Sequence, residues 1–114
     1  MNKSLSTKSA SIRQENHKFF VQGTLNVDTV VKLTKQSTQL ISQLTTQTQD
    51  TKICFDLKAV IIEDASAIAM LLSWIRAANK HRLAIEFNHL PEKLVAIAKL
   101  GGGDKIIQKE TTHE

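Results

Sequence analysis

The segment from residue 51 to residue 87 constrains the fold of this 114-residue chain more than any other. It begins with TKICFDL (51–57), a nearly continuous run of β-branched and aromatic residues, which predicts a central strand. A long helical pattern follows from about Asp64, and RLAIEF (82–87) then alternates apolar and charged residues as a second strand. Two strands separated by a helix of this length require a crossover connection, which predicts a mostly parallel sheet.

The flanking segments extend this pattern. SIRQE (11–15) and KFFVQ (18–22) predict two short strands joined by a turn at Asn16-His17, after which Gly23 breaks the pattern. Apolar residues recur at helical spacing over residues 27–47, and Asn26 or Asp28 is a candidate N-cap. The remainder predicts a short helix that starts at Pro91 and ends at Gly101-Gly102-Gly103, and a last strand at 105–109. We therefore expect one α/β domain over 11–109 in the order β-β-α-β-α-β-α-β, with flexible tails at 1–10 and 110–114.

The charge and hydropathy of the sequence argue against nucleic-acid binding, membrane spanning and secretion. Net charge is +4, but the Lys and Arg residues are spread along the chain, whereas a nucleic-acid interface would cluster them on one face. The charge suggests only a weak attraction to acidic partners or to an anionic membrane surface. No apolar stretch is long enough to span a membrane, and none follows the N-terminal lysines as in a signal peptide. We therefore expect a cytosolic protein.

Candidate catalytic and metal-binding groups are few. The single cysteine, Cys54, excludes an internal disulfide and is expected to be a buried, inert thiol. The four histidines lack metal-ligand spacing, and GGGDK (101–105) lacks the Gly-Lys-Ser/Thr ending of a phosphate-binding loop. Asp56 and Asp64 flank the predicted strand-to-helix turn. They could form an acid/base pair or a cation site, but such a pair needs a cleft and two different pKa values. We favour structural roles for them, in the turn and as a helix cap. We expect no catalytic residue, cofactor or metal, and hence no enzyme.

The helical segment EDASAIAMLLSWIRAANKH (63–81) carries more apolar residues than one buried stripe needs. At 100° per residue, a core-facing stripe is predicted from Ile68, Leu71, Leu72, Ile75, Ala78 and Asn79. The opposite side carries Ser66, Met70, Ser73, Ala77, Lys80 and His81, with Trp74 at one margin. Either the domain's own elements bury this side, or a partner covers a patch of Ser66, Met70, Ser73, Trp74 and Ala77. We predict the partner, because Trp is enriched at interface hot spots.

Three features resemble STAS domains, the family of sulfate transporters and anti-sigma factor antagonists, over about residues 11–109. GTLN (23–26) is similar to the turn before the first STAS helix, with Asn26 in place of the usual Asp. FDL (55–57), with Val60 and Asp64, resembles the strand and loop before the second helix, and residues 94–100 resemble a short leucine-rich helix. Within the family, the chain is most similar to the small stand-alone subunits of Mla-type phospholipid-transport ABC complexes.

This resemblance implies a STAS-like fold with helices mainly on one face of the sheet, and a non-catalytic docking module. The partner face in the family centres on the start of the second helix. In the anti-sigma factor antagonists a phosphorylated Ser directly follows the family aspartate, but here Ala65 follows Asp64 and Ser66 stands one residue later, rotated by 100°.

The missing hydroxyl favours constitutive binding to the cytoplasmic ATPase subunit of a transporter, peripheral to the inner membrane. The partner-binding residues implied are Asp64, Ala65, Ser66, Met70, Ser73, Trp74 and Ala77, with Lys80 and His81 at the rim. Two alternatives stay open: an anti-sigma factor antagonist regulated by phosphorylation of Ser66, and carriage of a lipid or small ligand in the domain core.

Overall fold

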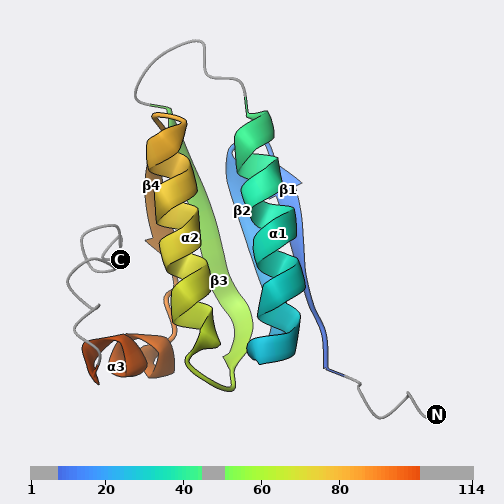
Figure 1. The fold of residues 1–114 in the computed structure, drawn as a ribbon, viewed down its shortest axis with the longest axis vertical. Coiled ribbons are helices and arrows are strands. Elements are labelled where there is room, and N and C mark those ends of the chain that lie inside the picture. Colours follow the sequence, from blue (N-terminus) through green and yellow to red (C-terminus); the bar gives the residue numbers. More distant parts are fainter. Residues whose placement is uncertain (1–7, 45–50, 101–114) are drawn as a thin grey trace.

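A computed structural model describes residues 8–44 and 51–100. These residues form a four-stranded sheet in the order β1-β2-β3-β4 (Figure 1). The strands are β1 (Ala10–Glu15), β2 (Lys18–Leu25), β3 (Lys52–Ile62) and β4 (Ala84–Asn88). β1 is antiparallel to β2, and the other neighbouring strands are parallel. The predicted mostly parallel sheet is confirmed, and the predicted strand at 105–109 lies outside the described residues.

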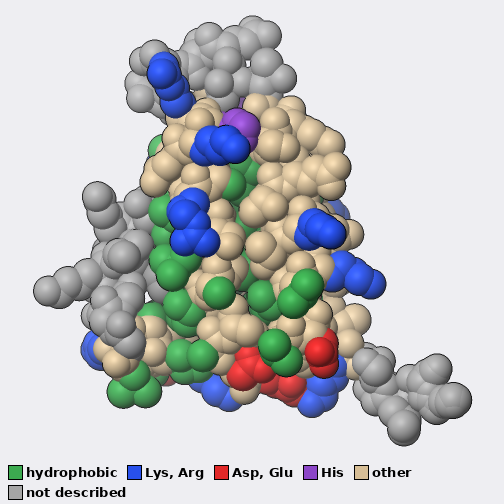
Figure 2. Space-filling model, viewed as in Figure 1, with side chains coloured by type: hydrophobic (Ala, Val, Ile, Leu, Met, Phe, Trp, Pro, Cys, Tyr) green, Lys and Arg blue, Asp and Glu red, His purple; other side chains and the backbone are tan. Residues whose placement is uncertain are grey.

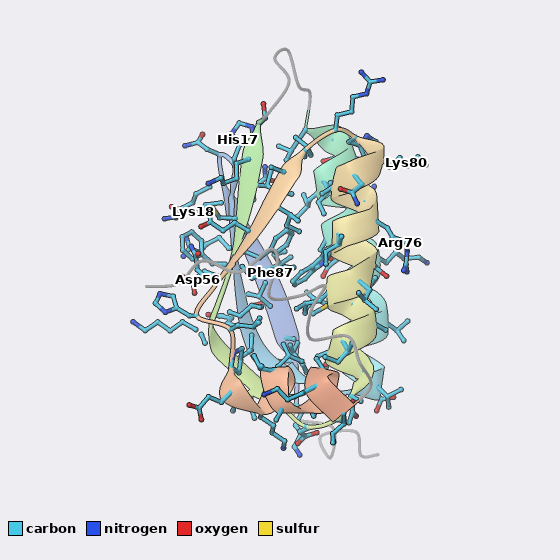
Figure 3. All side chains as sticks on the ribbon, turned by 90° about the vertical axis from the view of Figure 1, so that its left-hand side faces the viewer. His17, Lys18, Asp56, Arg76, Lys80 and Phe87 are labelled. Carbon is cyan, nitrogen blue, oxygen red and sulfur yellow. The ribbon has the colours of Figure 1, made fainter. Side chains whose placement is uncertain are left out.

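The helices follow the predicted order. α1 (Val27–Gln43) and α2 (Ser66–Lys80) lie side by side on one face of the sheet, and α3 (Glu92–Leu100) lies beside the start of α2, at the end of the molecule where both long helices begin (Figure 1). Seen edge-on, the sheet has α1 and α2 on one side only (Figure 3). Within the described residues no helix covers the other face, which we call the open face of the sheet.

The β1–β2 hairpin contains two residues with positive φ. Asn16, in the predicted turn, has φ 58°, a conformation that Asn tolerates well. Gly23 does not end the second strand as predicted, because β2 continues to Leu25. Its φ is 108°, and a Cβ there would lie 2.2 Å from the carbonyl oxygen of Ser9 and 2.7 Å from Cα of Ala10. The glycine is needed because the paired backbone passes too close for any side chain.

β3 is longer and less buried than expected. It runs five residues beyond Leu57, so Asp56 lies inside the strand and the turn role that we favoured for Asp56 is wrong. Alternate residues face the helices and the open face (Figure 3), which leaves Asp56 and Cys54 half-buried. Cys54 is therefore not fully buried; its Sγ lies 3.4 Å from Oε1 of Glu86. Burial and this hydrogen bond raise the pKa of the Cys54 thiol, so it remains a weak nucleophile.

The core is built around stacked aromatic rings between the sheet and the helices. Phe19 stacks on Phe55 at 4.8 Å between ring centroids, and Phe55 stacks on Trp74 at 4.0 Å. Phe87 lies 6.3 Å from both Phe55 and Trp74. The indole Nε1 of Trp74 donates to the hydroxyl of the buried Ser37 at 2.5 Å. One side chain of α2 thereby joins β3, β4 and α1.

Candidate functional site

The structure overturns the central part of the predicted partner-binding patch. Met70 and Trp74 are both 0% exposed, and they pack in the core between the sheet and α1. In contrast, Ile68 and Leu72, which were expected to point into the core, are only half-buried, and Asn79 is exposed. Leu71, Ile75 and Ala78 of the predicted stripe are buried as expected. The buried arc extends from them toward Met70 and Trp74, because α2 packs against the sheet and also against α1.

The other predicted contact residues separate into two groups. Ser73 and Ala77 are half-buried midway along α2, and Ala77 packs against the core. Lys80 is exposed and His81 half-buried at the far end of the helix. Asp64, Ala65 and Ser66 cluster at the start of α2: Ala65 is exposed, and Asp64 and Ser66 are half-buried. Only this last group adjoins the loop that the family resemblance indicates.

Asp64 uses both carboxylate oxygens at this loop. Oδ1 accepts hydrogen bonds from the backbone N–H of Ser66, at 2.9 Å, and from the Ser66 hydroxyl. Oδ2 accepts from the backbone N–H of Val27, the first residue of α1, at 3.1 Å. Asp64 therefore accepts from the first N–H of α2, although Ala65 occupies the N-cap position. The sequence did not predict the additional bond from Asp64 to α1.

Neighbouring side chains reinforce the contact between the loop and α1. Glu63 Oε1 accepts from the side-chain amide of Asn26 at 3.0 Å, and the other oxygen of Glu63 pairs with Lys8. Asn26 is the N-cap of α1, and its Oδ1 accepts from the backbone N–H groups of Asp28 and Thr29. Of the two candidate caps, Asn26 is therefore confirmed. The Thr29 hydroxyl accepts from the Asn26 N–H in return, which completes a capping box.

The two loop carboxylates are held ionised. Hydrogen bonds from the Ser66 hydroxyl and backbone, and then from the Val27 backbone, lower the pKa of Asp64 below its ordinary value. The ion pair with Lys8 and the hydrogen bond from Asn26 lower the pKa of Glu63. These negative charges lie where the positive ends of the α1 and α2 dipoles meet, and each helix favours an anion there.

Exposed apolar side chains surround this loop. Val27 and Val31 of α1 are 61% and 70% exposed, and Ala65 and Ala69 at the start of α2 are also exposed. Figure 2 shows hydrophobic side chains gathered over the first halves of α1 and α2, with acidic side chains at the adjoining end. We define the docking surface by its five residues: Val27, Val31, Ala65, Ser66 and Ala69.

The α1 part of this surface was not predicted from the sequence. Val27 and Val31 are four residues apart and so lie on one side of the helix. The buried face of α1 is formed instead by Val30, Leu33, Ser37 and Ile41. Val27 and Val31 lie outside that buried face, and this position was the sequence feature that could have predicted an exposed apolar surface on α1.

A concave region lies on the open face of the sheet, away from the docking surface. It has a volume of about 410 Å³, and its lining includes Arg13, Phe20, Asp56 and Lys58. The Arg13 guanidinium lies 4.4 Å from the Phe20 ring centroid and pairs with Glu15, so its charge is already balanced. Within residues 8–44 and 51–100, no group of three or more His, Cys, Asp or Glu side chains could hold a metal ion. No helix in the same residues is long and apolar enough to cross a membrane.

Comparison with known proteins identifies the fold. No protein-family model matches the chain, and no curated protein matches it. The anti-sigma factor antagonist SpoIIAA, in its unphosphorylated form, superposes with a TM-score of 0.65 at 11% sequence identity, over 90% of this chain and 85% of SpoIIAA. A Ser-to-Glu variant of RsbS from Moorella thermoacetica superposes with a TM-score of 0.59 at 13% identity, over 81% of this chain and 77% of RsbS.

At these identities the likeness shows the fold alone. Anti-sigma factor antagonists are one of the two groups from which the STAS family takes its name. The expected STAS-like α/β fold, with its mixed sheet and its helices on one face, is therefore confirmed.

Proposed function

We propose that this chain is a non-catalytic docking subunit that binds another protein through the docking surface. The observation that carries the proposal is the exposure of Val27 and Val31, at 61% and 70%, on a helix start whose backbone is held by capping bonds. Rigid, exposed apolar side chains lose little conformational entropy on binding, and their burial is favourable. The exposed Ala65 and Ala69 allow a partner's backbone to approach closely.

The partner we propose is the cytoplasmic ATPase subunit of a phospholipid-transport ABC complex, as for MlaB, the STAS subunit that the sequence resembles. Ala65 supports this choice, because it offers no hydroxyl at the position directly after Asp64. A surface without that hydroxyl suits permanent binding better than binding switched by phosphorylation there. In this role the chain would stabilise or activate the ATPase at the inner membrane, and the complex would maintain lipid asymmetry of the outer membrane.

The test is co-purification with the ATPase subunit after co-expression. We expect Val31→Glu to abolish the complex, because it places a charge in the centre of an apolar contact. The matched control is Ile61→Glu: Ile61 is 63% exposed, and its neighbour Ile62 faces the core, so Ile61 points to the open face. Both variants should retain the wild-type circular dichroism spectrum. A complex that survives Val31→Glu contradicts the docking surface, and a wild-type chain that binds no ATPase contradicts the partner.

The second candidate is an anti-sigma factor antagonist regulated by phosphorylation of Ser66. Two observations favour it: the superposition on SpoIIAA, and the position of the Ser66 hydroxyl at the start of α2, bonded to Asp64. A phosphate on Ser66 would add up to two negative charges beside the carboxylates of Asp64 and Glu63, and would disrupt the hydrogen bonds at this loop.

This alternative is tested by incubating the chain with a kinase encoded beside it and measuring the mass of its peptides. A phosphate on Ser66 that is absent from Ser66→Ala supports the switch, whereas an unmodified Ser66 contradicts it. Neighbouring genes separate the same two hypotheses: a permease and an ATPase indicate transport, and a sigma factor and a kinase indicate the switch.

A further inference from the structure

We infer that Asp64 is a positioning residue for the docking surface: its carboxylate joins the start of α1 to the start of α2 and so sets the position of the exposed valines relative to the exposed alanines. The inference rests on the proposed function, because it explains how the binding surface keeps its shape. It is carried by the hydrogen bonds of the β3–α2 loop.

The first turn of α1 depends on Asp64 for one of its backbone donors. The first N–H groups of a helix have no partner within the helix. Asn26 accepts from Asp28 and Thr29, and the N–H of Val30 bonds to the carbonyl of Asn26. The remaining donor, the N–H of Val27, bonds to Asp64, which lies 37 residues further along the chain. An acceptor from another element therefore completes the cap of α1.

The same carboxylate serves α2. Ala65, which occupies the N-cap position, makes no side-chain capping bond. Asp64 accepts from the backbone N–H of Ser66 instead, two residues ahead, as an N-cap side chain does. Because one oxygen faces α1 and the other faces α2, the carboxylate cannot serve both helices unless their starts keep this spacing.

Other contacts hold the helices together further along, so loss of Asp64 should loosen only their first turns. The buried hydrogen bond from Trp74 to Ser37 joins the middles of α1 and α2. Glu63 also reaches α1, but through the side chain of Asn26 and not through a backbone N–H of the helix. Val27 is both the residue held by Asp64 and a member of the docking surface, so its placement is the most sensitive to Asp64.

The bridge itself is tested by nuclear magnetic resonance on the chain alone. We expect the amide proton signals of Val27 and Ser66 to titrate together as Asp64 is protonated, with a common midpoint below the ordinary aspartate pKa. Asp64→Asn should abolish this titration at both amides. Asp28→Asn is the control, because it removes an equal charge from the first turn of α1 at a residue outside the β3–α2 loop. The pKa of Glu63 is also lowered, by its pairing with Lys8, so spectra of Glu63→Gln distinguish the two carboxylates.

Binding of the purified ATPase subunit tests the consequence. We expect Asp64→Ala to weaken binding about tenfold or more while Asp28→Ala stays within about twofold of wild type. Asp64→Asn, which keeps an acceptor oxygen, should recover part of the affinity and serves as the folded comparison if Asp64→Ala is unstable. Equal affinity of Asp64→Ala and wild type would overturn the inference. A Val27 amide signal that does not shift as Asp64 is protonated would overturn it as well. Failure of wild type to bind would refute the proposed partner, while the titration would still decide whether the bridge exists.

Discussion

At the scale of single residues, the contact between Trp74 and Ser37 decides how α1 and α2 fit together. Both side chains are 0% exposed, and the Ser37 hydroxyl accepts from the indole while it donates to the carbonyl of Leu33 at 2.7 Å. A hydroxyl in the apolar face of α1 is tolerated because both of its hydrogen-bonding functions are used. The pair also explains why a Trp that looked surplus on α2 belongs to the core.

We therefore expect Ser37→Ala to destabilise the domain by about 1–3 kcal/mol, because it leaves the buried indole N–H without an acceptor. The control is Ser42→Ala, which removes a similar hydroxyl from an exposed position of the same helix. Urea unfolding of both variants measures the difference. Equal midpoints for the two variants would show that the Trp74–Ser37 hydrogen bond contributes nothing.

The loop carboxylates predict how stability depends on pH. The pKa values of Glu63 and Asp64 are lowered in the folded chain, so the unfolded chain binds protons more tightly at both groups. Their contribution to stability is fully present above the ordinary values of 4.5 and 3.8, and it is lost as the pH falls through the lower folded values. Unfolding free energies measured across this acidic range should fall less steeply for Asp64→Asn than for wild type. An unchanged slope would show that Asp64 is not stabilised in its ionised form.

At the scale of elements, the orientation of α2 follows from its two packed neighbours. A helix that faces only a sheet buries one stripe, whereas α2 also packs against α1 and buries a wider arc. Ala67, Met70 and Trp74 occupy that arc, while Ile68 and Leu72 lie at its margin.

This orientation makes a testable contrast between two large apolar residues of α2. We expect Met70→Ala to cost about 2–5 kcal/mol, the range for a fully buried side chain that leaves a cavity. Leu72→Ala should cost clearly less, because Leu72 is half-buried and its loss opens no closed cavity. Thermal or urea unfolding measures both, and a larger loss for Leu72→Ala would restore the orientation that the sequence alone suggested.

At the scale of the whole molecule, the aromatic stack joins the elements into one core. Phe19, Phe55, Phe87 and Trp74 come from β2, β3, β4 and α2, and all are fully buried. Trp74 is the only tryptophan, so its fluorescence reports on the centre of this core. Because these elements share one core, they should lose their structure together.

We expect the unfolding curve from Trp74 fluorescence to coincide with that from far-ultraviolet circular dichroism. A denaturant titration followed by both signals on the same samples is sufficient. Distinct midpoints would show that some elements unfold independently of the aromatic stack, and would contradict a single cooperative core.

Local patterns in the sequence were enough to predict the order of elements through α3, the Asn16-His17 turn, and a cap of α1 at Asn26 or Asp28. These features depend on neighbours within a few residues, where propensity, spacing and capping chemistry act directly. The role of Asp64 at the start of α2 was predictable for the same reason.

Only the tertiary structure decided that the buried arc of α2 includes Met70 and Trp74, how far β3 continues, and that Asp64 also holds α1. The periodicity of a helix identifies its apolar positions, but which of them are covered depends on the elements that pack against it. For the same reason, the expected contact residues Met70 and Trp74 belong to the core. The exposure of Val27 and Val31 on α1 could be recognised only from the packing of α1 in the folded domain. A hydrogen bond between residues 37 positions apart is set by the packing of helices on the sheet, and no local pattern encodes it.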